Sequence, residues 1–228
     1  MEVTLSELMA ELASLNRETD GLPGFSGRGG PNPPASEADL AVFEAAHGVK
    51  LPTEYREFLL RAGNGGQWPL IRQEPFGGIG PDPWRSWDFR PGNISEPFPH
   101  THGWNDPSGE PTWNDGRAEE PGYEEEYERR MEVWGRRYFS LALLSGAVPL
   151  HDSGCARCVW LVVNGPLSGT VWFDCRVDRL GIYPITNHDG MWVRFNEWML
   201  LRVGYARRWL RWERKRAGSG TSSAPEAP

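Results

Sequence analysis

Three cysteines and two histidines in the second half of the chain are the residues best suited to hold a metal ion. Cys155 and Cys158 form a Cys-x-x-Cys pair, His151 precedes it, and Cys175 and His188 follow. Two thiolates at this spacing can converge on one tetrahedral zinc ion. A structural zinc site usually contains a second close pair, which the chain lacks, and buried free cysteine commonly acts as a small apolar side chain. We therefore expect no metal and no cofactor, with zinc held by the three cysteines as the alternative.

Other patterns typical of catalysis are absent or incomplete. No serine stands in a Gly-x-Ser-x-Gly turn, and Gly77-Gly78-Ile79-Gly80 lacks the lysine and hydroxyl residue of a phosphate-binding loop. His100 and His102 alternate, so on an extended chain their rings point in opposite directions. The Cys-x-x-Cys pair also lacks the βαβ surroundings of a redox motif. These observations favour a protein that is not an enzyme.

Residues 105–128 are strongly acidic: nine carboxylates are opposed by one arginine, a local charge of −8. Such a run is typical of a solvated, partly disordered segment. Alternatively, it binds a basic protein, because charge complementarity speeds encounter and selects partners, and interleaved aromatic residues supply the anchors of an interface. The candidate partner-binding residues are Trp104, Asp106, Glu110, Trp113, Asp115, Glu119, Glu120, Tyr123, Glu124, Glu125, Glu126 and Glu128.

A basic segment lies near the other end of the chain. Arg202, Arg207, Arg208, Arg211, Arg214, Lys215 and Arg216 are predicted to face solvent on the last helix, with Leu201, Tyr205, Trp209 and Trp212 as its apolar side. Cations near a helix C-terminus are favourable through the helix dipole, which explains most of them. Alternatively, these basic residues interact with the acidic segment of the same chain or bind RNA. The net charge of −7 argues against general nucleic-acid affinity.

The elements that carry these residues begin with three helices. Leu5, Leu8, Met9, Leu12 and Leu15 predict an amphipathic helix within residues 1–20. A linker rich in glycine and proline follows over residues 21–35. Ser36 and Asp39 predict a capped start for a helix over 37–47, which Gly48 ends. A third helix is expected after Leu51 and Pro52, with Thr53 as its cap.

The second half is expected to supply the sheet. Residues 68–87 predict one strand and a loop, residues 90–128 a loop-rich acidic insertion, and Tyr127, Met131 and Trp134 one face of a helix. Residues 159–163 and 169–174 predict an antiparallel hairpin, and residues 182–185 a short edge strand. A helix over about 195–215 closes the domain, and residues 217–228 read as a disordered tail.

Two groups of residues resemble the signature of the SUKH superfamily, the Smi/Knr-like proteins. The first comprises Phe43-Glu44, Leu51-Pro52, Tyr55, Phe58-Leu59 and Asn64-Gly65-Gly66. The second comprises residues 152–155 around Gly154, 161–166 around Gly165, 169–174 around Trp172, and Phe195 to Trp198. Capping, packing and turn geometry account for these motif residues, so we expect them to be structural.

The resemblance implies a fold and a function. The expected fold is one α+β domain, residues 36–216, with a mostly antiparallel sheet flanked by helices. Bacterial members are mostly immunity proteins, so we expect a protein that binds and neutralises a cognate, basic, nuclease-type toxin without covalent chemistry. A regulatory or scaffold module and a zinc protein or enzyme are the alternatives. The chain shows no secretory signal or membrane span, which predicts a cytoplasmic location, and its oligomeric state is left open.

Overall fold

One antiparallel sheet and five α-helices form a single α+β domain, as the sequence predicts. The structure, a computed structural model, describes residues 3–19, 31–66, 78–79 and 90–219 of the 228. The helices are α1 (Leu5–Thr19), α2 (Glu37–His47), α3 (Thr53–Arg61), α4 (Tyr123–Tyr138) and α5 (Phe195–Ser219), and the strands are β1 (Ala147–Gly154), β2 (Arg157–Val162), β3 (Val171–Asp174) and β4 (Ile182–Pro184). The predicted strand within residues 68–87 lies outside the described residues.

The sheet has the order β1-β2-β3-β4, and every neighbouring pair is antiparallel. The predicted hairpin is confirmed as β2 and β3, with Trp160 opposite Trp172, and the predicted edge strand as β4. Strand β1 was not predicted, and in its sequence Pro149 interrupts the apolar run of residues 147–150. Proline lacks an N–H donor, and the structure accommodates it in an edge strand whose register shifts between Pro149 and His151.

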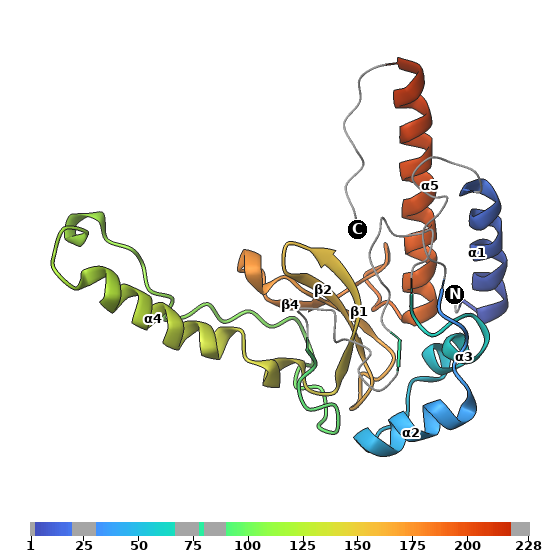
Figure 1. Ribbon diagram of the computed structural model, residues 1–228, viewed down its shortest axis with the longest axis horizontal. Coiled ribbons are helices and arrows are strands. Elements are labelled where there is room, and N and C mark those ends of the chain that lie inside the picture. The colour runs from blue at the N-terminus through green and yellow to red at the C-terminus, as the bar shows by residue number, and fades with distance from the viewer. Residues whose placement is uncertain (1–2, 20–30, 67–77, 80–89, 220–228) are drawn as a thin grey trace.

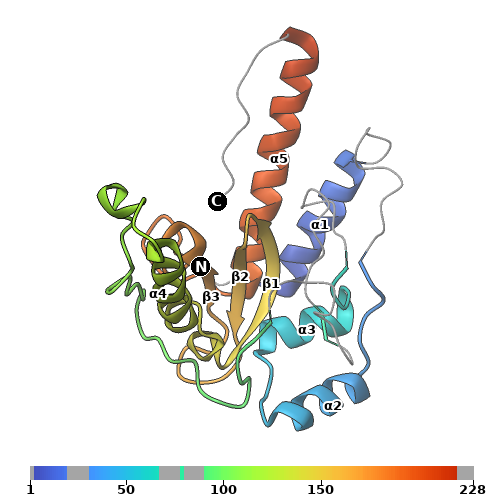
Figure 2. The same ribbon diagram turned by 60° about the vertical axis from the view of Figure 1, so that its left-hand side comes forward.

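The two faces of the sheet carry different cores. On one face, β1, β2 and β3 join α1, α3 and α5 in the larger hydrophobic cluster, and α1 lies beside α5 (Figures 1 and 2). On the other face, Trp160, Trp172 and Cys158 pack with Phe98 and Leu144. The buried tryptophans therefore pack against the segments on either side of the arm, through Phe98 and Leu144, while the helices cover the opposite face of the sheet.

The apolar face predicted for α5 is correct only for Trp209, which packs against the core. The buried apolar residues in the middle of the helix are Met199, Val203, Ala206 and Leu210, whereas Leu201 is 38% exposed. Arg202 was predicted to face solvent but is buried. Both stripes have helical spacing, so periodicity alone does not choose between them. The helix face that is buried in the structure includes Arg202, whose Nη2 lies 3.1 Å from Nε2 of His151 on β1.

Local signals set the ends of the N-terminal helices. Ser36 and Asp39 form the predicted capping box of α2, and Gly48 ends that helix with φ of 62°. Thr53, predicted to cap α3, is instead its first helical residue; the N-cap position is Pro52, which has no side chain able to accept a hydrogen bond. The carboxylate of Glu54 reaches the start of α5, where it accepts from the backbone N–H of Asn196 at 2.9 Å.

The chain turns sharply after α3. Gly65 and Gly66 adopt φ of 71° and 91°, which favours glycine. Asn64 fixes this turn with its side chain: its Oδ1 accepts from the N–H of Ile79 at 2.6 Å and its Nδ2 donates to the Ile79 carbonyl at 2.7 Å. The Asn-Gly-Gly motif therefore has a structural role.

Candidate partner-binding arm

All the predicted partner-binding residues except Trp104 lie on one projection, which we call the arm: residues 105–122 and helix α4. In Figures 1 and 2 the arm extends from the sheet on the side away from α1 and α5. Residues 105–122 contain one short 3₁₀ helix, Asp115–Arg117. The predicted helix carrying Tyr127, Met131 and Trp134 is α4, and it begins at Tyr123, so residues 123–128 of the insertion predicted as loop-rich are helical.

The base of the arm is fastened to the sheet through Arg176. This residue follows β3, is 4% exposed, and pairs with Asp174 at 2.7 Å. Its Nη1 also donates to the carbonyls of Tyr138 at 3.0 Å and Ser140 at 3.1 Å, at the C-terminal end of α4. The buried guanidinium therefore satisfies carbonyl oxygens at the end of α4, where a helix provides no further N–H donors.

The loop of the arm is tied to β4. Trp104 and Ile182 exchange two backbone hydrogen bonds of 2.7 and 2.8 Å, and the Trp104 ring lies 5.5 Å from that of Tyr138. Asn105 accepts from the Tyr138 hydroxyl at 2.7 Å and donates to the Arg179 carbonyl at 2.7 Å. Trp104 is therefore part of the framework, which leaves little of its ring for a partner.

Two carboxylates near the base are neutralised within the chain. Arg137 pairs with Asp106 at 2.7 Å, and Arg179 pairs with Glu110 at 2.6 Å while its guanidinium lies 4.6 Å from the ring centre of Trp134. Hydrogen bonds from Ser108, and then the charge of Arg137, lower the pKa of Asp106. These two acids hold the loop against α4.

An aromatic cluster forms the tip of the arm. The Trp113 ring lies 5.0 Å from the rings of both Tyr123 and Tyr127. Tyr123 is buried, and its hydroxyl oxygen accepts from the N–H of Asn114 at 2.8 Å. Trp113 remains 38% exposed, so it presents an apolar surface at the tip.

Carboxylates surround this cluster, and only some of them are paired. Arg117 pairs with Glu120 at 2.9 Å and Glu126 at 3.6 Å. Within the described part of the chain, the remaining five make no ion pair, and all are exposed: Asp115, Glu119, Glu124, Glu125 and Glu128. We call these five residues and Trp113 the acidic tip.

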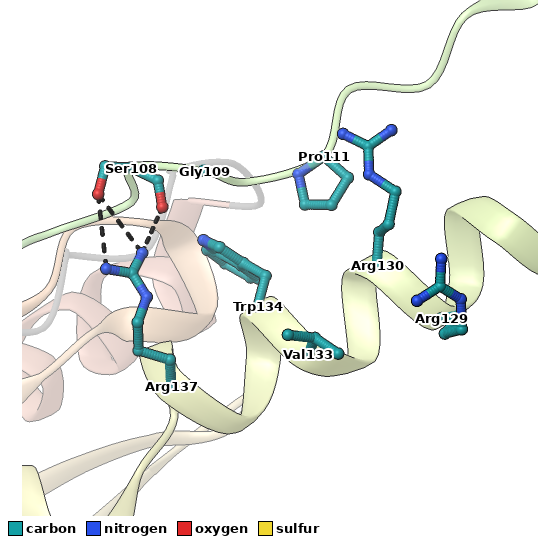
Figure 3. Close-up of a pocket in the computed structure, with 8 residues that line it drawn as sticks. All are labelled: Ser108, Gly109, Pro111, Arg129, Arg130, Val133, Trp134 and Arg137. Carbon is teal, nitrogen blue, oxygen red and sulfur yellow. Dashed lines mark hydrogen bonds between the residues drawn. The ribbon is translucent and has the colours of Figure 1, made fainter.

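An open groove of about 440 Å³ runs between the loop and α4 (Figure 3). Ser108, Gly109 and Pro111 form one wall, and side chains of α4 form the other: Arg129, Arg130, Val133, Trp134 and Arg137. Val133 is 62% exposed. The groove therefore has arginines and apolar surface but no carboxylate among its lining residues, in contrast to the acidic tip.

The three cysteines occupy different environments. Cys155 is exposed at the hairpin turn between β1 and β2, whereas Cys158 and Cys175 are buried. Burial raises the pKa of Cys158 well above its usual value, and burial with a hydrogen bond to Asp178 raises that of Cys175 to about 11. Among residues 3–19, 31–66, 78–79 and 90–219, no three His, Cys, Asp or Glu side chains are grouped to hold a metal ion.

The residues that carry the SUKH resemblance lie in the core and its turns. Leu51, Pro52, Tyr55 and Phe58 are buried near α5, where the Tyr55 and Phe58 rings lie 5.0 and 5.1 Å from that of Phe195. Trp172 and Trp198 are buried on the sheet and on α5. Gly154 and Gly165 have φ of 77° and 103°.

A helix-flanked antiparallel sheet in one α+β domain is the architecture expected of a SUKH protein. The model of the SMI1 / KNR4 family (SUKH-1) matches residues 34–197, so the chain belongs to this family. Neither the search of curated proteins nor that of solved structures returned a significant match. In the described residues, we find no helix long and apolar enough to span a membrane.

The arginines that neutralise part of the arm were not predicted from the sequence. The spacing of Arg117 and Glu120 by three residues could have indicated their pairing on one helical turn. Arg179 lies 69 residues from Glu110 and Arg137 lies 31 from Asp106. No local pattern joins residues at such separations, so the acidic tip could not be distinguished from the neutralised base.

Proposed function

We propose that the protein is an immunity protein that binds and neutralises a cognate toxin by stoichiometric, non-covalent binding in the cytoplasm. Membership of the SMI1 / KNR4 family carries this proposal, because bacterial SUKH proteins are mostly immunity proteins. The proposal requires no catalytic residue, since occluding a toxin needs affinity and not turnover.

The acidic tip is the surface we propose for the toxin. Its five carboxylates, which make no ion pair with any residue that the structure describes, lie near an exposed tryptophan, a residue type enriched in interface hot spots. Such a surface suits a basic protein, including a nuclease, whose positive active-site region it could cover. Long-range attraction then increases the association rate, and salt reduces that increase. Asp106, Glu110, Glu120 and Glu126 contribute less, because arginines of the same chain already pair with them.

Co-expression with the toxins encoded beside the gene tests the function. We expect a complex of fixed stoichiometry that co-purifies, and survival of cells that carry both genes. No complex with any neighbouring toxin, and no protection, would refute the immunity role. Capture of an endogenous regulatory protein instead would support the scaffold alternative.

A charge-reversal pair tests the surface. The tip variant combines Glu119→Lys with Glu124→Lys. The control variant combines Glu57→Lys on α3 with Asp189→Lys before α5, which makes the same change of charge at exposed sites elsewhere. We expect the tip variant to lower the toxin association rate at least about tenfold at low salt, and the control to change it little. Equal effects of both variants would show that net charge, not the tip, governs binding.

A further inference from the structure

The outer face of α4 carries a regular row of charges, which we call the outer stripe: Glu125, Arg129, Glu132 and Arg136. Their spacings are four, three and four residues. At about 100° per residue, the four side chains fall within about 60° of one another around the helix axis. All four are exposed, with Glu132 at 62% and Arg136 at 74% of the side chain. The opposite face of α4 carries the buried Tyr123, Trp134 and Tyr138.

The order of charges along the outer stripe is self-complementary in one orientation only. The signs alternate from acid to arginine along the helix, so a second copy running antiparallel places an arginine opposite every acid. Glu125 then faces Arg136 of the second copy, and Arg129 faces Glu132 of the second copy. The two-fold axis repeats both pairs, giving four in total. A parallel second copy in register would instead place like charges together.

Pairing within one helix leaves part of the outer stripe unused. Glu132 and Arg136 form an ion pair four residues apart. Glu125 and Arg129 have the same spacing and the same favourable order, yet within the described residues neither makes an ion pair. These two side chains are therefore available to a second copy, and Glu132 and Arg136 can exchange partners without leaving a buried charge.

Apolar surface accompanies the outer stripe. Val133 beside it is 62% exposed, and Phe139 and Leu141 at the base of the arm are 41% and 48% exposed. In an antiparallel arrangement the tip of one arm lies near the base of the other, so these side chains lose contact with water. Antiparallel helix dipoles also attract each other.

We propose that two copies of the protein associate through their arms, with the α4 helices antiparallel along the outer stripe. Because exposed ion pairs contribute little individually and salt screens them, the dimer is weak and strongly dependent on salt. The proposal does not depend on the toxin, because only copies of this chain take part. Asp115, Glu119 and Glu124 lie outside the stripe.

Analytical ultracentrifugation of the full chain over a concentration series, at about 0.02 M and about 0.5 M NaCl, tests the association. We expect a reversible dimer at low salt whose dissociation constant rises at least about tenfold at high salt. Protein that stays monomeric up to about 1 mM at low salt would overturn the proposal. A dimer of unchanged affinity at high salt would overturn it as well, because its contacts would lie elsewhere.

A charge exchange tests the orientation. Glu125→Arg or Arg136→Glu alone places like charges opposite each other twice in the dimer, and we expect each to weaken association at least about tenfold. The double variant restores opposite charges and should return the affinity to within about threefold of the original. Glu57→Arg is the control for net charge. Failure of the double variant to recover, with unchanged helix content by circular dichroism, contradicts the antiparallel register.

The Arg129→Glu and Glu132→Arg variants provide an independent pair. They test the same register at the two central positions of the stripe. Glu132→Arg also removes the ion pair that Glu132 makes with Arg136 within α4, so helix content by circular dichroism is compared in every variant. We expect the same loss in each single variant and the same recovery in the double variant. A loss in both single variants without recovery in the double variant would contradict the antiparallel register.

Discussion

Removal of the Arg176 guanidinium should destabilise the protein more than any surface change on the arm. The guanidinium donates to Asp174 at 2.9 and 2.7 Å and to the carbonyls of Tyr138 and Ser140 at 3.0 and 3.1 Å. The side chains of Arg176 and Asp174 are only 5% and 9% exposed. Arg176→Met retains most of the aliphatic chain but leaves the Asp174 carboxylate buried beside no cation.

The expected loss follows from these contacts. Breaking a buried ion pair by removing one partner costs about 3–5 kcal/mol. The Asp174 carboxylate keeps one hydrogen bond, from the backbone N–H of Arg176 at 3.1 Å, which places the loss near the lower end of that range. We expect the free energy of unfolding to fall by about 3 kcal/mol. The double variant Asp174→Asn with Arg176→Met removes the buried charge and should recover at least about 1 kcal/mol.

Urea denaturation measures both values, and the m-value shows whether unfolding stays two-state. Hydrogen exchange at the C-terminal end of α4 should accelerate in Arg176→Met before exchange in the sheet does, because Arg176 binds the last carbonyls of that helix. A loss of less than about 1 kcal/mol would refute the anchoring role of Arg176. A double variant no more stable than the single one would show that the unpaired carboxylate is not the main cost.

Two further predictions concern His100 and Gly181, which both lie beside Trp104 where the arm meets the sheet. Burial lowers the pKa of His100, so the ring in the folded protein stays neutral to a lower pH than in the unfolded chain, where it is protonated below about pH 6.5. The stability advantage of the native protein over His100→Gln should therefore shrink as pH falls from about 7 to about 5, and parallel curves in urea denaturation would contradict this reasoning. Gly181→Ala should lower the melting temperature more than Gly190→Ala. Both glycines have positive φ, but a Cβ on Gly181 would lie 2.1 Å from the Trp104 carbonyl oxygen, whereas a Cβ on Gly190 would meet nothing within 4 Å. Equal losses in the two variants would show that backbone strain alone, at about 1–2 kcal/mol, explains the effect.

Local patterns were sufficient for most elements of the fold. Ser36 and Gly48 delimit α2 as predicted, and the β-branched run of residues 159–163 predicts β2. The patterns failed where tertiary contacts decide. Strand β1 was not predicted because a proline such as Pro149 is tolerated in a strand only at the edge of a sheet, and the edge position is not visible in the sequence. The buried face of α5 depends on where Arg202 meets His151.

The candidate site could be predicted only in part. Acidic and aromatic residues were correctly seen as concentrated in one segment, and the structure places them on one arm. Which acids remain unpaired depends on arginines distant in sequence, chiefly Arg137 and Arg179. The regular charges of α4 are visible in the sequence, but the choice of outward face requires the burial of Tyr123 and Trp134.

The short turn after β3 holds the arm to the sheet through its side chains. Arg176 and Arg179 both lie in this turn, and they hold the end of α4 and the loop residue Glu110 respectively. The acidic tip makes no ion pair with the core in the described residues. Substitutions at Glu119 or Glu124 should therefore change the charge with little effect on the fold, while substitutions in the turn should alter the position of the whole arm. If the acidic tip binds the toxin as proposed, variants that lose affinity with unchanged stability will lie at the tip.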